Sequence, residues 1–136
     1  MPTRTRRTAR QAGALMETKT AEYLNWALDT DIIERRRPNG VKDRGDLSGV
    51  RYRGHRVVVE CKNTTRMNVS KHLAEAETER GNDDALIGVV VQKRPGIGIA
   101  TREGQGRQLV MMTLGTLALI LNDGLPLGPD QAEENQ

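Results

Sequence analysis

A chain of 136 residues is long enough for one hydrophobic core but too short for two domains of ordinary size. The single cysteine excludes an internal disulfide, and no apolar run approaches the roughly 20 residues of a membrane-spanning helix, so we expect a soluble cytoplasmic protein. The formal net charge of +3 becomes +6 over residues 1–129, which hold 21 basic and 15 acidic residues, and this excess favours a polyanionic partner.

The first ten residues carry four arginines and no acid: Arg4, Arg6, Arg7 and Arg10. Threonine and proline separate them, and no helical or strand-like periodicity is present. We expect a disordered basic arm over residues 1–10. Such an arm either touches phosphates without reading a sequence or is only a solvated tail.

Residues 12–29 have apolar side chains at spacings of three and four, which predicts an amphipathic helix. Glu17 falls on or beside the apolar stripe, because the residues four and seven positions later are Ala21 and Leu24. Glu22 falls on the opposite, charged face. Glu17 is therefore either a boundary residue of the core or part of a functional site.

A short strand over residues 32–37 is predicted to run into a basic loop, which Pro38-Asn39-Gly40 turns back. Five basic residues lie in this region: Arg35, Arg36, Arg37, Lys42 and Arg44. Beside a carboxylate site they would attract phosphate. The alternative is a solvated loop.

The segment His55–Asn63 contains three consecutive valines and predicts a buried strand. Side chains alternate between the two faces of a strand, so Glu60 and Lys62 are expected side by side on one face. Cys61 then points into the core, where a thiol is inert. We expect the chemistry of the protein at this strand.

Asp46 precedes a second predicted strand, which extends from Asp46 to Tyr52 and turns at Arg53-Gly54 into the first. If the two strands pair, Asp46 and Glu60 come close together. Carboxylates on rigid strands are suitable ligands for Mg²⁺, which takes oxygen donors in octahedral geometry.

The second half of the chain predicts further elements in alternation. A helix is expected at 70–80 with Ser70 as N-cap, Gly81 as its stop and solvated glutamates, and a buried central strand at 85–93. A glycine-rich loop, which could form a hairpin, follows at 96–106. A strand is expected at 108–113 and an almost wholly apolar helix at 114–122. That helix must be buried or packed against another subunit. We expect the last dozen residues to be disordered.

Four segments together resemble the PD-(D/E)xK nuclease superfamily, and within it the archaeal-type Holliday junction resolvases. They are Gly13-x-x-x-Glu17, Arg44-Gly45-Asp46, Val57-Val58-Val59-Glu60-Cys61-Lys62-Asn63 and Gln92-Lys93-Arg94. The resemblance covers about residues 11–94, but Gly45 stands where the superfamily name has proline. It implies a restriction-endonuclease-like α/β core, in which a central mixed sheet is flanked by helices.

The same resemblance implies a Mg²⁺ cofactor, with Mn²⁺ as a substitute, and a homodimer. Asp46, Glu60 and the backbone carbonyl of Cys61 would bind the metal. Lys62 would assist the attacking water, and Glu17 would complete the catalytic set.

The resulting prediction is a single nuclease domain over residues 11–123, acting on four-way or other branched DNA. Its DNA-binding surface would comprise the basic residues named above together with Arg66, Lys93 and Arg94. One alternative is a nuclease for linear or nicked duplex. Another is a non-catalytic nucleic-acid-binding module, which the acidic pocket and the presence of only three aromatic residues disfavour.

Overall fold

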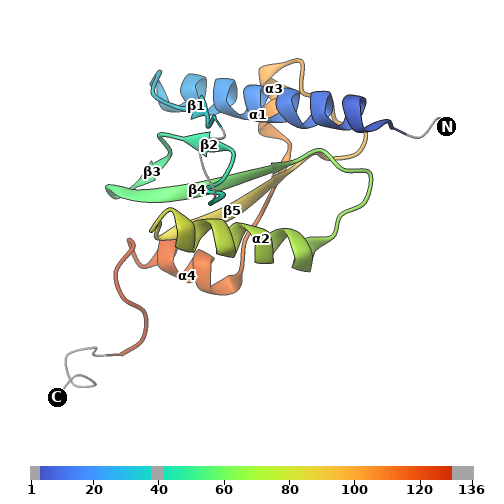
Figure 1. Cartoon of the computed structure of the whole chain (residues 1–136). Coiled ribbons are helices and arrows are strands. Elements are labelled where there is room, and N and C mark those ends of the chain that lie inside the picture. The colour runs from blue at the N-terminus through green and yellow to red at the C-terminus, as the bar shows by residue number, and fades with distance from the viewer. Residues whose placement is uncertain (1–3, 38–41, 130–136) are drawn as a thin grey trace.

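The computed structural model describes residues 4–37 and 42–129, and it has a four-stranded mixed sheet with helices on both faces (Figure 1). In chain order the elements are α1 (Arg6–Leu28), β1 (Glu34–Arg35), β2 (Leu47–Ser48), β3 (Arg51–Tyr52), β4 (His55–Lys62), α2 (Val69–Asn82), β5 (Ile87–Gln92), α3 (Arg102–Gly106), β6 (Leu109–Met111) and α4 (Leu114–Leu121). The expected α/β class, with a mixed sheet flanked by helices, is confirmed.

The sheet has the strand order β3-β4-β5-β6, with the two longest strands at its centre. β4 pairs antiparallel with β3 and parallel with β5. A parallel pair needs a crossover connection, which α2 provides. β6 adds antiparallel to β5, while β1 and β2 form a separate two-stranded ladder.

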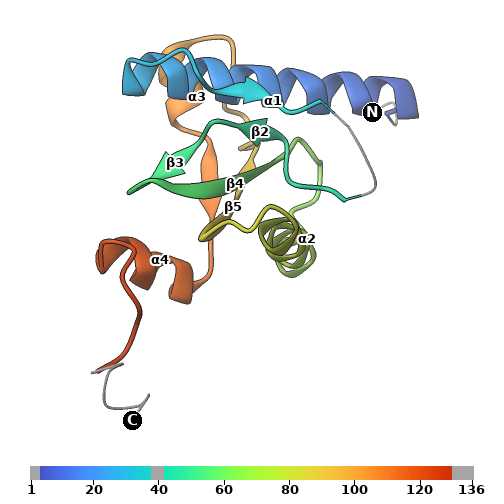
Figure 2. The ribbon, with the colours of Figure 1, turned by 60° about the vertical axis from the view of Figure 1, so that its left-hand side comes forward.

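The two faces of the sheet are covered by different helices. α1 and α3 lie over one face, and α2 and α4 lie over the other (Figures 1 and 2). Val59 and Cys61 of β4 join Met16 of α1 in the main apolar cluster, whereas Val58 and Val90 are fully buried outside that cluster. The centre of the sheet is therefore buried on both faces, as the continuous apolar runs predict.

The predicted hairpin between the second and third strands is present, but its first strand is broken. Arg53 and Gly54 both have positive φ, at 51° and 80°, as a tight two-residue hairpin turn requires. Gly49, with φ +83°, interrupts the predicted strand Asp46–Tyr52, and a Cβ there would collide with the carbonyl oxygen of Ile32. The chain turns at this glycine, so β2 pairs with β1 and only β3 pairs with β4.

The prediction of a disordered arm over residues 1–10 is wrong from Arg6 onward. Thr5 caps α1 by accepting a hydrogen bond from the N–H of Thr8 at 3.2 Å, and the helix begins at Arg6. Arginine is a good helix former, and this cap begins the helix well before the apolar periodicity does. Residues 1–3 lie outside the described part of the chain, as do residues 38–41 and 130–136 of the basic loop and the tail.

Two further boundaries differ from the sequence prediction. α2 is capped by Asn68 instead of Ser70, and it continues through Gly81 to Asn82. The glycine-rich segment forms no hairpin, because Thr101 caps the short helix α3 by accepting a hydrogen bond from the N–H of Gly104. A local capping hydrogen bond determines where α2 and α3 begin, and such a bond leaves no trace in the apolar periodicity of the sequence.

The apolar helix α4 has no fully buried residue in this single chain. Leu114 and Leu121 are 80% and 77% exposed, and only one side of the helix approaches the rest of the molecule, where Tyr52 donates a hydrogen bond to the carbonyl of Ile120. Among the described residues, no helix is both long and apolar enough to cross a membrane.

Candidate active site

Asp46 is fixed against the edge of β4 by hydrogen bonds to that strand. Its N–H donates to the carbonyl of Val59 at 3.0 Å, and its Oδ2 accepts the N–H of Cys61 at 2.7 Å. Gly45, with φ +94°, allows this approach, because a Cβ there would lie 2.9 Å from Cγ1 of Val58. The Gly-Asp pair therefore brings a carboxylate to the middle of the sheet edge.

Glu60 and Lys62 lie side by side on one face of β4, as strand alternation predicts. The Nζ of Lys62 is 3.3 Å from Oε1 of Glu60 and 2.6 Å from Oε2 of Glu75 in α2. Although burial lowers the pKa of Lys62, the hydrogen bond that Lys62 donates to Glu75 and the charge of Glu60 raise this pKa above the ordinary value on balance. Lys62 is therefore an ammonium ion, a donor and not a base.

Glu17 reaches the same edge from α1. Its side chain is 20% exposed, and its Oε2 accepts a hydrogen bond from Nε of Arg35 at 2.9 Å. It lies close enough to Asp46 to raise the pKa of that carboxyl by charge and by hydrogen bonding. Glu22 is exposed and pairs with Lys19, so the two glutamates of α1 face different environments, as their spacing predicts.

Asp46 has its pKa raised to about 8, first by burial and then by the charge of Glu60. The hydrogen bond from the Cys61 N–H lowers it only in part. Glu17, Asp46, Glu60 and Lys62, which the sequence singled out, are thus brought together at one place. Crowded carboxylates that retain protons at neutral pH form a site that a cation would stabilise.

Two carboxylates that the sequence did not single out complete this region. Oxygen atoms of Asp43, Glu60 and Glu79 all lie within 4.8 Å of one another. Glu79 projects from α2 and is only 4% exposed, and its pKa is raised by burial and by its hydrogen bond and charge interaction with Glu60. We call Glu17, Asp43, Asp46, Glu60 and Glu79 the acidic site.

The donors of the acidic site fit a hard divalent cation such as Mg²⁺. Oε2 of Glu60 and Oε2 of Glu79 are buried and have no hydrogen-bond partner among the described residues. The N–H and C=O of one strand residue point to the same side, so the Cys61 carbonyl faces the same edge as its N–H, toward Asp46. Glu60 belongs both to the predicted metal ligands, with Asp46 and the Cys61 carbonyl, and to the carboxylate group that it forms with Asp43 and Glu79.

The interpretation of the α2 glutamates as a solvated face is wrong for Glu79, which is buried, while Glu75 is half-buried and pairs with Lys62. The residues buried in α2 are His72, Ala76 and Glu79. These follow one another at spacings of four and three, which is helical periodicity carried partly by polar side chains. A search of the sequence for any repeat at these spacings, polar residues included, could have found them.

The basic residues predicted to contact DNA fall into two groups. Arg6, Arg7, Arg10, Arg37, Lys42, Arg44, Arg66 and Arg94 are exposed, as are Arg4 and Arg35, while Arg36 and Lys93 are half-buried. Arg35 and Arg36 form ion pairs with Glu17 and Asp83, so both also bind within the protein. Arg4 donates to the carbonyl of Asn63 at 2.6 Å, which places the start of the described chain beside the end of β4.

A scan against protein-family models, a search of curated proteins and a search of solved structures each found no match to this chain. The resemblance to the PD-(D/E)xK nucleases therefore depends on the four sequence segments alone.

Proposed function

We propose that the protein is a metal-dependent endonuclease that hydrolyses phosphodiester bonds in DNA. The observation that carries the proposal is the meeting of Glu17, Asp46, Glu60 and Lys62 at one edge of β4. These residues come from three separate parts of the chain. A protein that only binds nucleic acid has no use for buried carboxylates that repel phosphate.

In this proposal Asp46, Glu60 and the Cys61 carbonyl hold the cation, with Asp43 and Glu79 next to them. A bound Mg²⁺ or Mn²⁺ would act as a Lewis acid and lower the pKa of a coordinated water. Oxygen donors from rigid strands suit such an ion, and the buried oxygens without partners on Glu60 and Glu79 are the structural reason to expect one.

The other side chains act on the substrate. Hydrolysis joins a water oxygen to phosphorus and breaks a P–O bond to the departing sugar oxygen, which takes up a proton, while negative charge increases on the phosphoryl oxygens. Lys62, charged and oriented by Glu75 at 2.6 Å, would stabilise that charge or orient the water. Glu17 would orient water from the α1 side of the site.

Branched DNA is the favoured substrate within this proposal. One metal site cuts one strand, so resolving a four-way junction requires two sites related by two-fold symmetry. The exposed face of α4, formed by Leu114, Leu117 and Leu121, offers a surface for a second copy of the chain. Basic residues near the ends of α1 and β4 would hold the arms through phosphates, without reading a sequence.

One assay tests the activity and the substrate together. A four-way junction and a linear duplex of matched sequence are incubated with the protein, with Mg²⁺ or with EDTA, and the products are separated on a denaturing gel. We expect Mg²⁺-dependent paired cuts in the junction and weaker cutting of the duplex. Equal cutting of both would make the protein a nuclease for linear DNA, and absence of cutting in every condition would refute the proposal.

A further inference from the structure

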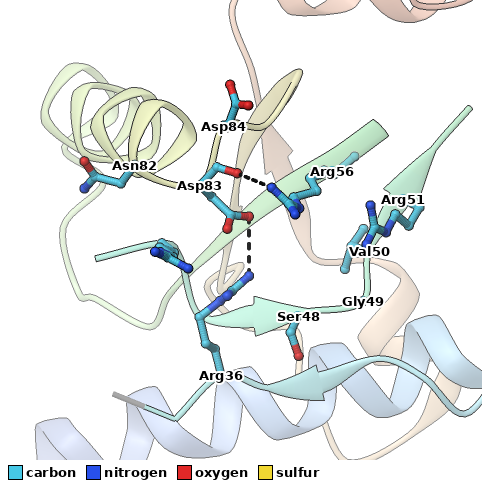
Figure 3. Close-up of a pocket in the computed structure, with 11 residues that line it drawn as sticks. Arg36, Ser48, Gly49, Val50, Arg51, Arg56, Asn82, Asp83 and Asp84 are labelled. Carbon is cyan, nitrogen blue, oxygen red and sulfur yellow. Dashed lines mark hydrogen bonds and ion pairs between the residues drawn. The ribbon is translucent and has the colours of Figure 1, made fainter. Parts of the chain in front are cut away.

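A second polar region lies along β4, separate from the acidic site. It is a cavity of about 430 Å³ between the β2–β3 connection, the start of β4 and the end of α2 (Figure 3). Four arginines and two aspartates contribute to its wall: Arg36, Arg44, Arg51, Arg56, Asp83 and Asp84. We call it the arginine pocket.

Asp83 holds one side of the arginine pocket in place. Its Oδ2 is 3.4 Å from Nη2 of Arg36, and its carbonyl accepts a hydrogen bond from Nη1 of Arg56 at 3.1 Å (Figure 3). Asp83 is only 7% exposed, so these two guanidinium groups are fixed against a buried residue. Nε of Arg36 is itself buried and has no hydrogen-bond partner among the described residues.

The other two arginines leave positive charge uncompensated. Within residues 4–37 and 42–129, neither Arg44 nor Arg51 has an ion pair or a side-chain hydrogen bond. Against the four guanidinium groups stand only the carboxylates of Asp83 and Asp84, which leaves a formal excess of two positive charges in the cavity wall. Gathered like charges repel each other, and an anion in the cavity would remove that repulsion.

The shape of the guanidinium group narrows the choice of anion. Arginine presents planar, paired N–H donors that match the oxygens of phosphate, and it remains charged at every physiological pH. Four such groups converge on one concave site, where a phosphate would accept hydrogen bonds from several directions. A flat basic surface would attract phosphate only by its charge.

The position of the pocket relative to the acidic site indicates which phosphate it takes. Arg56 and Glu60 are four residues apart on β4, so their side chains project from the same face and their Cα atoms are about 13 Å apart. A nucleic-acid strand spans that distance within a few nucleotides. One strand can therefore reach both regions.

We propose that the arginine pocket binds a phosphate group of a nucleic-acid strand, a few nucleotides from the phosphate that lies at the acidic site. The assignment of that second phosphate rests on the proposed nuclease function, whereas phosphate binding itself does not. The pocket would fix the register of the strand and would thereby set the distance between the cut and the bound phosphate.

The first arm of the test uses inorganic phosphate alone, without metal. Phosphate replaces chloride at constant ionic strength, and the arginine Nε–H signals are followed by NMR in the full chain. We expect the signals of the pocket arginines to follow one saturable curve. The double variant Arg44→Gln/Arg51→Gln should bind at least tenfold more weakly. It should melt no lower than the wild-type chain, because neither side chain has a partner among the described residues and their mutual repulsion is removed.

Arg107→Gln is the matched control, because Arg107 is an exposed arginine at the end of α3 whose side chain has no ion pair among the described residues. It should leave phosphate binding unchanged. The control removes one charge and the double variant removes two, so a control that lost half as much binding free energy as the double variant would mean that net charge and not the pocket binds phosphate, and would overturn the proposal. Absence of a saturable response in the wild-type chain would also overturn it.

The second arm identifies the source of the phosphate, again in EDTA so that no strand is cut. Duplexes with a 5′-phosphate or a 5′-hydroxyl are added to the phosphate-loaded protein. Equal displacement by both supports an internal phosphate, and displacement only by the first supports a terminal one. Displacement by poly-glutamate but by neither duplex would indicate an acidic protein partner and overturn the proposal.

The two proposals fail in different ways in these experiments. A chain that binds phosphate in the arginine pocket but cuts no DNA would refute the nuclease and keep the pocket. A chain that cuts DNA and shows no saturable phosphate binding would refute the pocket and keep the nuclease.

Discussion

α2 and α4 lie on the same side of the sheet, yet the burial of each helix is the opposite of what its composition predicts. α2 is largely polar, and it buries His72 and Glu79 as well as Ala76. α4 is almost wholly apolar, and it buries no residue completely. Burial is therefore not explained by hydropathy alone on this side of the sheet.

The difference follows from what each helix covers. α2 lies above β4 and β5 where Glu60 and Lys62 project, so its inner face carries, besides Ala76, groups that interact with charges, namely Glu75, Glu79 and His72. Burying Glu79 and His72 costs free energy that burying apolar side chains would not cost. A buried polar face is therefore evidence of a site, and an exposed apolar face is evidence of a partner.

Removing a charge from the site beneath α2 should have the largest effect. We expect Asp46→Asn or Glu60→Gln to abolish detectable cleavage, because each replaces a negatively charged donor with a neutral amide. DNA binding should persist, because neither change touches the basic surface. Cleavage gels and fluorescence anisotropy, with the same DNA, separate the two effects, and undiminished cleavage by either variant would refute the assignment of these residues.

Glu17 provides a smaller test from the opposite side of the sheet. Glu17→Gln should reduce turnover by at least about tenfold, or roughly 1.4 kcal/mol of activation free energy. Glu22→Gln is the matched control on the same helix, because Glu22 is exposed and pairs only with Lys19 among the described residues. Single-turnover rates for both variants provide the measurement, and equal losses would mean that Glu17 has no special role.

The protons held by the acidic site should make stability depend on pH. Asp46 and Glu79 have raised pKa values, so between the ordinary carboxyl pKa and the raised one the folded state binds more protons than the unfolded state. The free energy of unfolding in EDTA should therefore fall as the pH rises from 5 to 8. His72, with its pKa lowered by burial and by Lys62, opposes this trend over a narrower range.

Glu79→Gln should reduce this pH dependence, and Glu77→Gln should not, because Glu77 lies on the exposed side of α2 and pairs with Arg80. Mg²⁺ should stabilise the wild-type chain more at pH 8 than at pH 5. A change of 1 kcal/mol moves the melting temperature of a domain of this size by about 4 °C, so thermal melts can detect it. A melting temperature that rises steadily from pH 5 to pH 8 in EDTA would contradict the raised pKa values.

Much of the central site could be predicted because it depends on local rules. Strand alternation places Glu60 beside Lys62, and the expected hairpin at Arg53-Gly54 leads the segment that carries Asp46 back to β4. Helical spacing separates Glu17 from Glu22. Each pair on one element is a few residues apart, and Asp46 is fifteen residues before its hydrogen-bond partner Cys61 in β4, within a locally folded segment.

The remaining site residues depend on contacts between distant segments. Asp43 and Glu79 meet Glu60 only after α2 has crossed over the sheet, and the arginine pocket gathers residues from positions 36 to 84. Periodicity read with apolar residues alone also missed the buried His72 and Glu79 of α2. It gave no indication that Thr5 would extend α1 to Arg6, since a capping hydrogen bond is local but leaves no apolar pattern.

The apolar face of α4 provides the last test, on the side of the comparison where a partner is expected. Leu114 and Leu121 lie seven residues apart on that face, and exposure of 80% and 77% leaves them little to pack against within one chain. We expect the wild-type chain to sediment as a homodimer and the variant Leu114→Gln/Leu121→Gln to sediment as a folded monomer. Leu28→Gln, at a leucine of α1 that is 61% exposed, is the control and should leave the dimer intact. The monomeric variant should still nick DNA in the presence of Mg²⁺, because the acidic site is complete within one chain, but it should lose the paired cuts in a four-way junction. A wild-type chain that is monomeric at micromolar concentration would remove α4 as a dimer interface and leave the acidic site untouched.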